Sequence, residues 1–461
     1  MRSSHLLRSG FPGCSAAMLM AALVASAAAE DGAKMRIGGA GWMGYGSIMA
    51  SSHDTTGGVD IVGKPLISSG AQMLLEAQPG ENLDIQAGLG VGGGHALAFS
   101  LQNAGGYSPF GVGPYVAQAN FTYHFDRDEQ GATFLRGGLF AYDYAKETQN
   151  LGLYLLRGPV YPGYLISGFE TKHVLPVANT LGLQFHHGSG AFQQDVLFQV
   201  ETEFYPFYDV SPVYLAAFQG EAFRIGGGVN FHHLIPVDPD LTTDTTRFRY
   251  IDTTNPAAPD TIQLSAKGIK LMANGMVDMK ALFGGMESLG PEDLKIYGEV
   301  GVIGLGGLFR DDIHLGSTPK YKKNSKQAYD DLYGPISQRM PKMIGFNLPA
   351  FKLLDRLAVE VEHYGAPFQD DITKMTSHTS SNVQSVMPQD PDSAISADNI
   401  RWSVYASRVI QNHIKVSLQI ASDHYRPGLF VGYGDNVPPS TQAVLYRPKD
   451  WYLMTKVAYF F

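Results

Sequence analysis

The feature that most constrains the fold of this 461-residue chain is a period-two alternation of side chains in many short segments. One face of the last such segment consists of Trp451, Leu453, Thr455, Val457, Tyr459 and Phe461. Successive side chains of a β-strand point to opposite faces, so one apolar face and one mixed face indicate a half-exposed strand. A strand of this kind suits a wall with lipid on one side, although a soluble sandwich would alternate as well.

Alternation alone does not choose between these two folds, but together with the end signals described below it predicts an all-β fold, a single antiparallel transmembrane β-barrel of about sixteen strands. The predicted strands are 35–49, 66–78, 83–98, 114–125, 132–145, 179–188, 193–206, 212–219, 222–233, 264–276, 293–306, 340–348, 355–364, 400–410, 413–424 and 450–461. Short links alternate with long ones, as expected when short turns face the periplasm and long loops face the exterior. Only the links 207–211 and 277–292 depart from this rule. Fourteen or eighteen strands stay open, because boundaries read from one sequence err by a few residues.

The N-terminus has the parts of a secretory signal peptide. Arg2 and Arg8 precede the apolar run 16–25, and the small residues 27–29 come before Glu30. The run is too short and wrongly flanked for a membrane-spanning helix. We therefore predict that residues 1–29 are cleaved and that residues 30–461 form the barrel with its long exterior loops.

Charge and cysteine content exclude two classes of function. The formal net charge of −9 argues against nucleic acid as a partner. The one cysteine, Cys14, lies in the predicted signal peptide, so the mature chain is expected to have no disulfide and no thiol chemistry. No apolar window of helix length follows residue 29.

Two motifs that could indicate a cofactor or a metal have simpler readings. Gly88–Gly93 has the glycine spacing of a dinucleotide site, but it lies inside an alternating strand instead of a strand-to-helix turn, which favours a crowded barrel wall or a bend. In the pairs 186–187 and 232–233, neighbouring histidines point to opposite faces, so each pair offers one ligand to the lumen. We predict no cofactor, no metal site and no catalytic residue.

Charged residues at the predicted inner positions are the candidates for lining a channel. A charge facing hydrocarbon at the membrane midplane costs about 2–4 kcal/mol, so these residues are expected to face inward. The predicted channel-lining set is Glu201, Glu203, Arg224, Glu299, Glu360, Glu362 and Lys415. The glutamates could line water, pair with basic residues inside the barrel, or do both.

The long predicted exterior link 146–178 is unusually apolar for a loop in solvent. It contains the run 151–156, followed by Pro159, Pro162 and Gly163. We predict that this link folds inward or packs on the rim of the barrel. The alternative is that residues 151–156 extend a pair of strands above the membrane.

The C-terminal residues Val457, Tyr459 and Phe461 resemble the signal by which bacterial outer-membrane barrels are recognised for insertion. The architecture and both end signals resemble the general trimeric porins of diderm bacteria, as a pattern and not as a motif. This resemblance implies a location in outer-membrane lipid, the barrel-assembly machinery as a partner, small hydrophilic solutes and a homotrimer. In such porins the third exterior loop folds into the lumen and narrows it.

A further likeness is carried by a few short stretches. Asn150–Arg157 with 159–163, Gly345–Pro349, Leu353–Asp355 and Val359–Glu362 are similar to an uncharacterised family of fibrobacterial outer-membrane barrels. The stretches cover about a tenth of the chain, and the family implies no catalytic residues.

Two functions of different classes follow from these patterns. The first is a passive, water-filled channel with a weak cation preference set by the inner glutamates. The second is a structural or adhesive surface protein that contacts polysaccharide or proteins through loop aromatics, and the fold alone does not decide between them. The loop aromatics are Tyr321, Tyr329, Tyr333, Tyr425, Phe430 and Tyr433.

Overall fold

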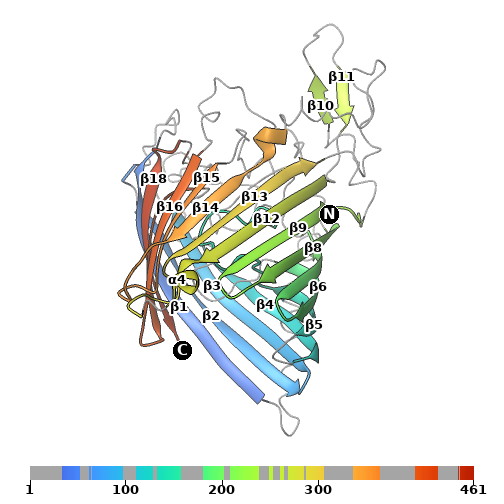
Figure 1. The fold of residues 1–461 in the computed structure, drawn as a ribbon, viewed down its shortest axis with the longest axis horizontal. Helices are drawn as coiled ribbons and strands as arrows, with labels where there is room; N and C mark the ends of the chain where they lie inside the picture. Colours follow the sequence, from blue (N-terminus) through green and yellow to red (C-terminus); the bar gives the residue numbers. More distant parts are fainter. Residues whose placement is uncertain are drawn as a thin grey trace, which may run out of the picture.

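The computed structural model shows one closed antiparallel barrel of sixteen strands (Figure 1). The residues that it describes are 34–51, 62–63, 65–96, 111–127, 132–156, 180–201, 208–237, 249–252, 260–263, 268–284, 287–305, 336–363, 400–423, 445 and 447–461. The predicted fold class and strand number are therefore confirmed.

Most barrel strands agree closely with their predicted ranges. They are β1 (Lys34–Ala50), β2 (Pro65–Gly80), β3 (Leu83–Ala96), β4 (Gly111–Asp126), β5 (Thr133–Phe140), β6 (Thr180–Ser189), β7 (Phe192–Val200), β8 (Val210–Gln219), β9 (Phe223–His232), β12 (Gly268–Asp278), β13 (Lys295–Leu305), β14 (Lys342–Asn347), β15 (Arg356–His363), β16 (Ile400–Ile410), β17 (Ile414–Ser422) and β18 (Trp451–Phe460). Strands β5 and β7 end earlier than predicted. A separate two-stranded sheet, β10 (Arg249–Asp252) with β11 (Asp260–Gln263), lies within the link predicted as an exterior loop.

Helical structure is limited to short links in the described residues. The helix α4 (Met279–Phe283) follows β12, and Asp278 caps it by accepting hydrogen bonds from the N–H groups of Lys280 and Ala281. A single 3-10 turn, η1 (Ile336–Arg339), precedes β14. No helix among the described residues is long and apolar enough to cross a membrane.

The barrel closes where the first and last strands meet. The main-chain N–H of Gly39 donates to the Phe461 carbonyl at 3.0 Å, and the N–H of Phe461 donates to the Gly39 carbonyl at 3.1 Å. The pairing of β1 with β18 continues from Ala40–Phe460 upward. Closure gives the edge groups of both strands their partners, which a wall in lipid requires.

The outer face of the wall is apolar at alternating positions. On β1, Met43 and Tyr45 are 65% and 62% exposed, whereas Ile48, which points to the other face, is fully buried. The same alternation places Val457, Tyr459 and Phe461 on the outer face of β18, at 45%, 52% and 63% exposure. Exposed apolar side chains in such numbers are unusual for a protein surface in water and fit a lipid-facing wall.

The glycines of Gly88–Gly93 lie within β3, paired with β2 and β4, and the register with β4 shifts between Gly88 and Leu89. A Cβ atom at Gly90 would lie 2.3 Å from the ring of Tyr115, the residue directly opposite it on β4. The crowded-wall reading is therefore confirmed at Gly90, because a neighbouring ring occupies the space that a side chain would need there.

Candidate functional site

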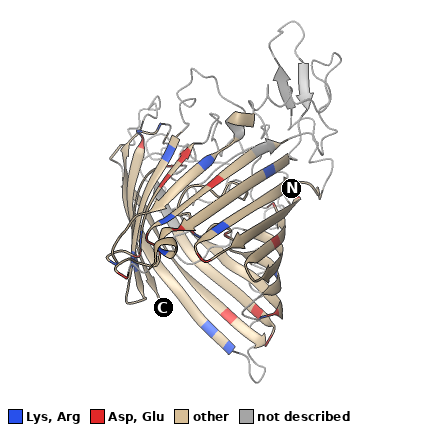
Figure 2. Ribbon diagram, viewed as in Figure 1, with Lys and Arg blue, Asp and Glu red and all other residues tan. Residues whose placement is uncertain are grey.

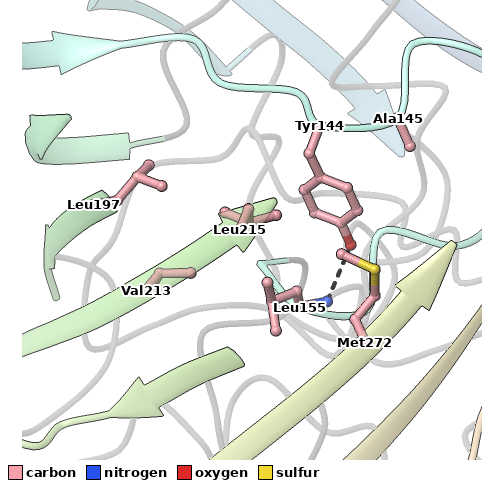
Figure 3. Packing of buried hydrophobic residues seen from close by; sticks show 7 residues of the cluster. All are labelled: Tyr144, Ala145, Leu155, Leu197, Val213, Leu215 and Met272. Atoms are coloured by element: carbon pink, nitrogen blue, oxygen red, sulfur yellow. Dashed lines mark hydrogen bonds between the residues drawn. The ribbon is translucent and has the colours of Figure 1, made fainter. Parts of the chain in front are cut away.

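The segment that follows β5, residues 141–156, folds into the barrel and is called the inner segment below. Its residues Tyr144, Ala145 and Leu155 pack against Leu197, Val213, Leu215 and Met272 of strands β7, β8 and β12 (Figure 3). Outer-face neighbours of these residues, such as Phe198 and Tyr214, are 42% and 40% exposed, so the packing is on the inner face. For the part of the link 146–178 that the structure describes, inward folding is confirmed; residues 157–178 lie outside it.

Six consecutive backbone N–H groups of the inner segment donate to three glutamates of the wall. Glu360 accepts from Gln149, Asn150 and Leu151 at 2.5, 2.9 and 2.8 Å. Glu362 accepts from Gly152 at 3.4 Å. Glu299 accepts from Leu153 and Tyr154 at 2.9 and 2.7 Å. We call Glu299, Glu360 and Glu362 the glutamate latch.

Each latch glutamate also accepts a hydrogen bond from one tyrosine hydroxyl. Tyr144 donates to Glu299 at 2.7 Å, Tyr154 to Glu362 at 2.9 Å and Tyr297 to Glu360 at 2.9 Å. Two of these tyrosines belong to the inner segment itself, and Tyr297 lies two positions before Glu299 on β13. Sequence reasoning missed all three, although the spacing of Tyr297 and Glu299 places both on one face of a strand.

Strand register brings the latch together. Glu299 is opposite Met343, and Met343 is in turn opposite Glu362, so the three form a row across β13, β14 and β15. In the next row, Tyr297 is opposite Gly345 and Gly345 is opposite Glu360. A Cβ atom at Gly345 would clash with the Tyr297 ring, so this glycine lets the ring cross β14 to its glutamate.

The inner segment has the backbone shape to bind carboxylates. Gly152 and Leu153 have positive φ angles of 80° and 62°. Residues in the left-handed region turn successive N–H groups toward one side of the chain, which makes a concave site for an anion. Burial strengthens the arrangement, since the three glutamates are 4%, 1% and 0% exposed. Hydrogen bonds to a charged acceptor contribute about 1.5–3 kcal/mol each.

Burial also keeps the latch tyrosine of the inner segment in its donating form. Burial, followed by the negative charge of Glu299, raises the pKa of Tyr144 well above its ordinary value. The hydroxyl therefore stays protonated and donates to Glu299, while it accepts from the N–H of Leu155 at 3.1 Å.

Arg224 of β9 is the predicted site residue that holds the other end of the inner segment. One guanidinium nitrogen lies 3.6 Å from Glu147, and another donates to the carbonyl of Tyr144. Both partners belong to the inner segment, so Arg224 works with the latch from β9, which lies between β8 and β12 in the barrel.

The remaining predicted site residues lie elsewhere. Glu201 is 9% exposed, follows β7 and lies 3.8 Å from His233, which contacts Asp209 at 3.1 Å. Lys415 is half-buried on β17, opposite Ala458. Glu203 and the loop aromatics proposed for adhesion lie outside the described residues. Within those residues, no group of three or more His, Cys, Asp or Glu is arranged to hold a metal.

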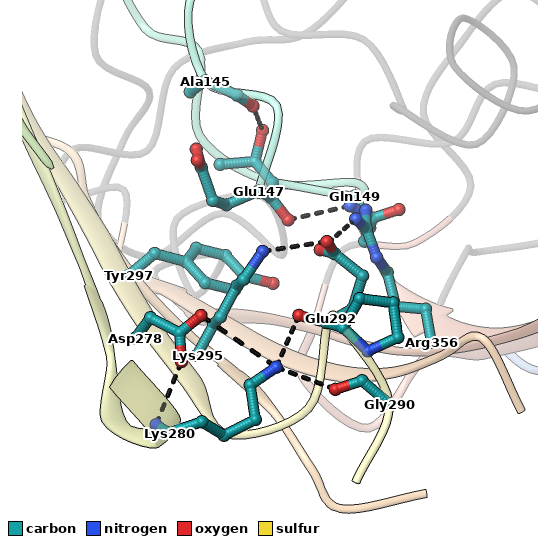
Figure 4. A network of polar contacts seen from close by, with 12 residues as sticks. Ala145, Glu147, Gln149, Asp278, Lys280, Gly290, Glu292, Lys295, Tyr297 and Arg356 are labelled. Atoms are coloured by element: carbon teal, nitrogen blue, oxygen red, sulfur yellow. Dashed lines mark hydrogen bonds and ion pairs between the residues drawn. The ribbon is translucent and has the colours of Figure 1, made fainter. Parts of the chain in front are cut away.

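A second polar network stands where α4 leads into β13, at the end of the barrel with the short turns (Figure 4). Glu292 contacts Lys295 at 2.8 Å and Arg356 at 2.5 Å. The Lys280 ammonium donates to the carbonyl of Gly290 at 2.7 Å. Burial alone would raise the pKa of Glu292, but the bond from Lys295 and the charge of Arg356 outweigh it and hold that pKa below its ordinary value.

No sequence-family model matches the chain, and no curated protein matches it. Among solved structures, OmpF of Salmonella typhi in complex with daunomycin is 10% identical, with a TM-score of 0.47 over 94% of this chain and 98% of its own. A mutant of the Rh. blastica porin is 8% identical, with a TM-score of 0.44 over 93% of this chain and 100% of its own. We call the barrel porin-like because it is closed and has sixteen strands, and not because of these similarities.

Proposed function

We propose that the protein is a passive diffusion channel for small hydrophilic solutes in the outer membrane of a diderm bacterium, without enzymatic activity. The observation that carries this proposal is the inner segment, fixed by the latch to one side of a sixteen-stranded wall. Barrels of about 16–18 strands are the size at which the interior holds an aqueous channel. A segment attached to part of the wall in this way narrows such a channel.

The wall supplies the function without chemistry. Closure of the sheet satisfies the backbone groups, the apolar outer face contacts lipid, and the polar inner face contacts water. The bore left beside the inner segment would then set which solutes pass by size, and its charges would set which ions pass.

A weak cation preference is part of the proposal, and its support is indirect. Glu360 is covered by the inner segment, and its partners at hydrogen-bond distance are the neutral N–H and O–H donors described above. No Lys or Arg among the described residues lies within ion-pair distance of it. Its negative charge therefore contributes to the potential of the lumen, even though permeating ions do not touch it.

Planar-bilayer recording on the purified protein tests the channel. We expect stepwise conductance and a small reversal potential of the sign for cations in a salt gradient. Equal permeability for cations and anions would refute the cation preference alone. The absence of any conductance would refute the channel and favour the adhesive alternative.

Val457, Tyr459 and Phe461 are proposed as the signal for insertion by the barrel-assembly machinery. Their support is position, since all three are exposed on the outer face of the closing strand and the rings of Tyr459 and Phe461 stack at 6.5 Å. Phe461→Ala should lower the fraction of heat-modifiable protein in outer membranes, whereas Phe460→Ala, on the other face, should not. Equal loss in both variants would contradict the proposal. A homotrimer is proposed with it, and native electrophoresis in mild detergent tests that assembly.

A further inference from the structure

On the inner wall made by β1, β2, β3 and β4, charged residues are confined to one end of the barrel. The described Lys, Arg, Asp and Glu residues of these strands all lie beside the short turns (Figure 2), namely Lys34, Arg36, Glu76, Asp84 and Asp126. The rest of this wall carries uncharged side chains at inner positions, which are glycine, alanine, serine, amide, aromatic and aliphatic, the last including Ile48 and Leu66. A solute that touches it meets no formal charge.

Two aromatic residues, Trp42 and Tyr115, lie on this wall and are called the aromatic platform below. Each is directly opposite a glycine of the adjacent strand, Gly70 for Trp42 and Gly90 for Tyr115. A Cβ atom at either glycine would lie 2.3 Å from the ring that covers it. The rings therefore lie against the strand backbone of the wall, in the space that side chains would otherwise fill.

The two rings are neighbours and face the lumen. A Cβ atom built at Gly92 would lie 3.3 Å from the Tyr115 ring and 3.6 Å from the Trp42 ring, so both reach the same point of the wall. Met43 and Leu89, the chain neighbours of Trp42 and Gly90, are 65% and 51% exposed on the outer face. The alternation of the strands then directs the platform inward, where both rings are half-buried.

The platform is held in place before any ligand arrives. The Tyr115 hydroxyl donates to the side-chain carbonyl of the buried Gln72 at 2.9 Å. Because Gly70 and Gly90 have no side chains, the rings can lie against the strand backbone, and the pairing with the adjacent strand fixes their positions. Such fixed aromatic groups bind a flat partner with little loss of conformational freedom.

We propose that the aromatic platform binds neutral pyranose sugars as they pass through the lumen. The C–H groups on one face of a pyranose carry partial positive charge and pack on the negative face of an aromatic ring. The sugar hydroxyls at the edge of the ring find polar side chains such as Ser68, which is half-buried on the same wall. An ion gains nothing from an uncharged wall, so the chemistry of the platform selects a neutral polyhydroxylated solute. The inference rests on the proposed channel and names a substrate class for it.

The test is the block of ion current by the neutral trisaccharide maltotriose, measured by single-channel recording on the full-length barrel. Maltotriose should interrupt the current of the unaltered protein in a concentration-dependent way. Trp42→Ala and Tyr115→Ala should each keep the ion conductance and weaken the block by about tenfold, the upper value expected for one ring contact. Tyr115→Phe keeps the ring and should keep most of the block.

Tyr45→Ala is the matched control, since Tyr45 lies on the same strand as Trp42 and faces outward at 62% exposure. The same block in the unaltered protein, Trp42→Ala and Tyr115→Ala would overturn the platform and leave the channel standing. If maltotriose did not block the current of the unaltered protein, the platform would also be overturned and the channel would stand, because another part of the chain would then cover the rings. No ion current in any protein would instead refute the proposed function itself.

Discussion

The inner wall of the barrel is used in two ways, which a comparison of β13–β15 with β1–β4 makes clear. On β13–β15 the inner positions carry Glu299, Glu360 and Glu362, and the inner segment covers them. On β1–β3 the corresponding positions are often glycine, and rings from the neighbouring strands lie over several of them. The outer faces of both regions show the same apolar alternation.

The difference shows how inner positions of a single sheet are covered in two ways, by a separate chain segment or by rings of the adjacent strands. A buried carboxylate is stable only with hydrogen-bond donors around it, so the latch requires a chain segment to supply them. A glycine at an inner position requires nothing from the lumen and leaves room for a ring. The latch wall (β13–β15) therefore holds a chain segment inside the barrel, whereas in the glycine wall (β1–β4) rings of the wall itself cover inner glycines.

The largest effect is expected when the latch wall is broken by the double substitution Glu360→Ala with Glu362→Ala. The N–H groups of residues 149–152 would lose their acceptors, at a cost of about 4 kcal/mol in the attachment of the inner segment. We expect a larger and noisier single-channel conductance and faster trypsin cleavage within the inner segment, which contains Lys146.

Val361→Ala is the control for this prediction, because Val361 lies between the two glutamates and faces outward at 42% exposure. It should leave conductance and cleavage unchanged. Unchanged conductance in the double variant would show that the inner segment holds its place without the latch.

On the glycine wall, the addition of a single methyl group is expected to displace the ring that covers the glycine. In Gly70→Ala the new Cβ atom would lie 2.3 Å from the Trp42 ring and must displace it, at a cost of about 2 kcal/mol. In Gly92→Ala the nearest contacts are 3.3 and 3.6 Å, so the ring needs to move little. We expect a lower temperature of heat modification on electrophoresis, and weaker maltotriose block, for Gly70→Ala alone. Equal behaviour of both variants would mean that the ring of Trp42 does not rest on Gly70.

The two walls also differ in what the sequence could predict. Period-two alternation placed the strands of both, because burial of one face dictates that pattern, and it placed Glu299, Glu360 and Glu362 at inner positions. The apolar run 151–156 predicted an inward fold, but not that β5 would stop at Phe140 to start it. The end of β5 depends on tertiary contacts of Tyr144 with strands far along the chain, which no local pattern contains.

Side-chain contacts between strands could not be predicted from the sequence, for the same reason. The contacts between Tyr297 and Glu360, and between Trp42 and Gly70, depend on strand register. A register is fixed only when the neighbouring strands and turns are in place, and a shift of one residue would move each side chain to the other face. The sequence indicated a crowded wall around the glycines of β3, but it contained no pattern that identified Tyr115 as the residue whose ring covers Gly90.

A smaller effect is expected when one tyrosine of the latch wall loses its hydroxyl. Tyr154→Phe removes the donor to Glu362 at 2.9 Å and leaves the N–H donors of the inner segment in place. The loss should be about 1 kcal/mol, seen as a modest increase in current noise without a change in mean conductance. Tyr45→Phe, on the outer face, is the control. A change as large as that of the double glutamate variant would show that the hydroxyls and not the amides hold the segment.

The smallest effect concerns the Glu292 network. It lies next to the latch wall, but it includes neither a latch glutamate nor a residue of the aromatic platform. The pKa of Glu292 is lower in the folded protein than in the unfolded chain, so its bonds to Lys295 and Arg356 stabilise the fold above the unfolded pKa. That contribution falls as the pH drops from the ordinary glutamate range through the folded pKa. Because the group is partly exposed, we expect a loss below about 1 kcal/mol. The temperature of heat modification, followed from pH 6 down to pH 3, should fall less in Glu292→Gln than in the unaltered protein, since the glutamine has no charge to lose. Identical pH curves for the two proteins would show that this acid sensitivity does not arise at Glu292.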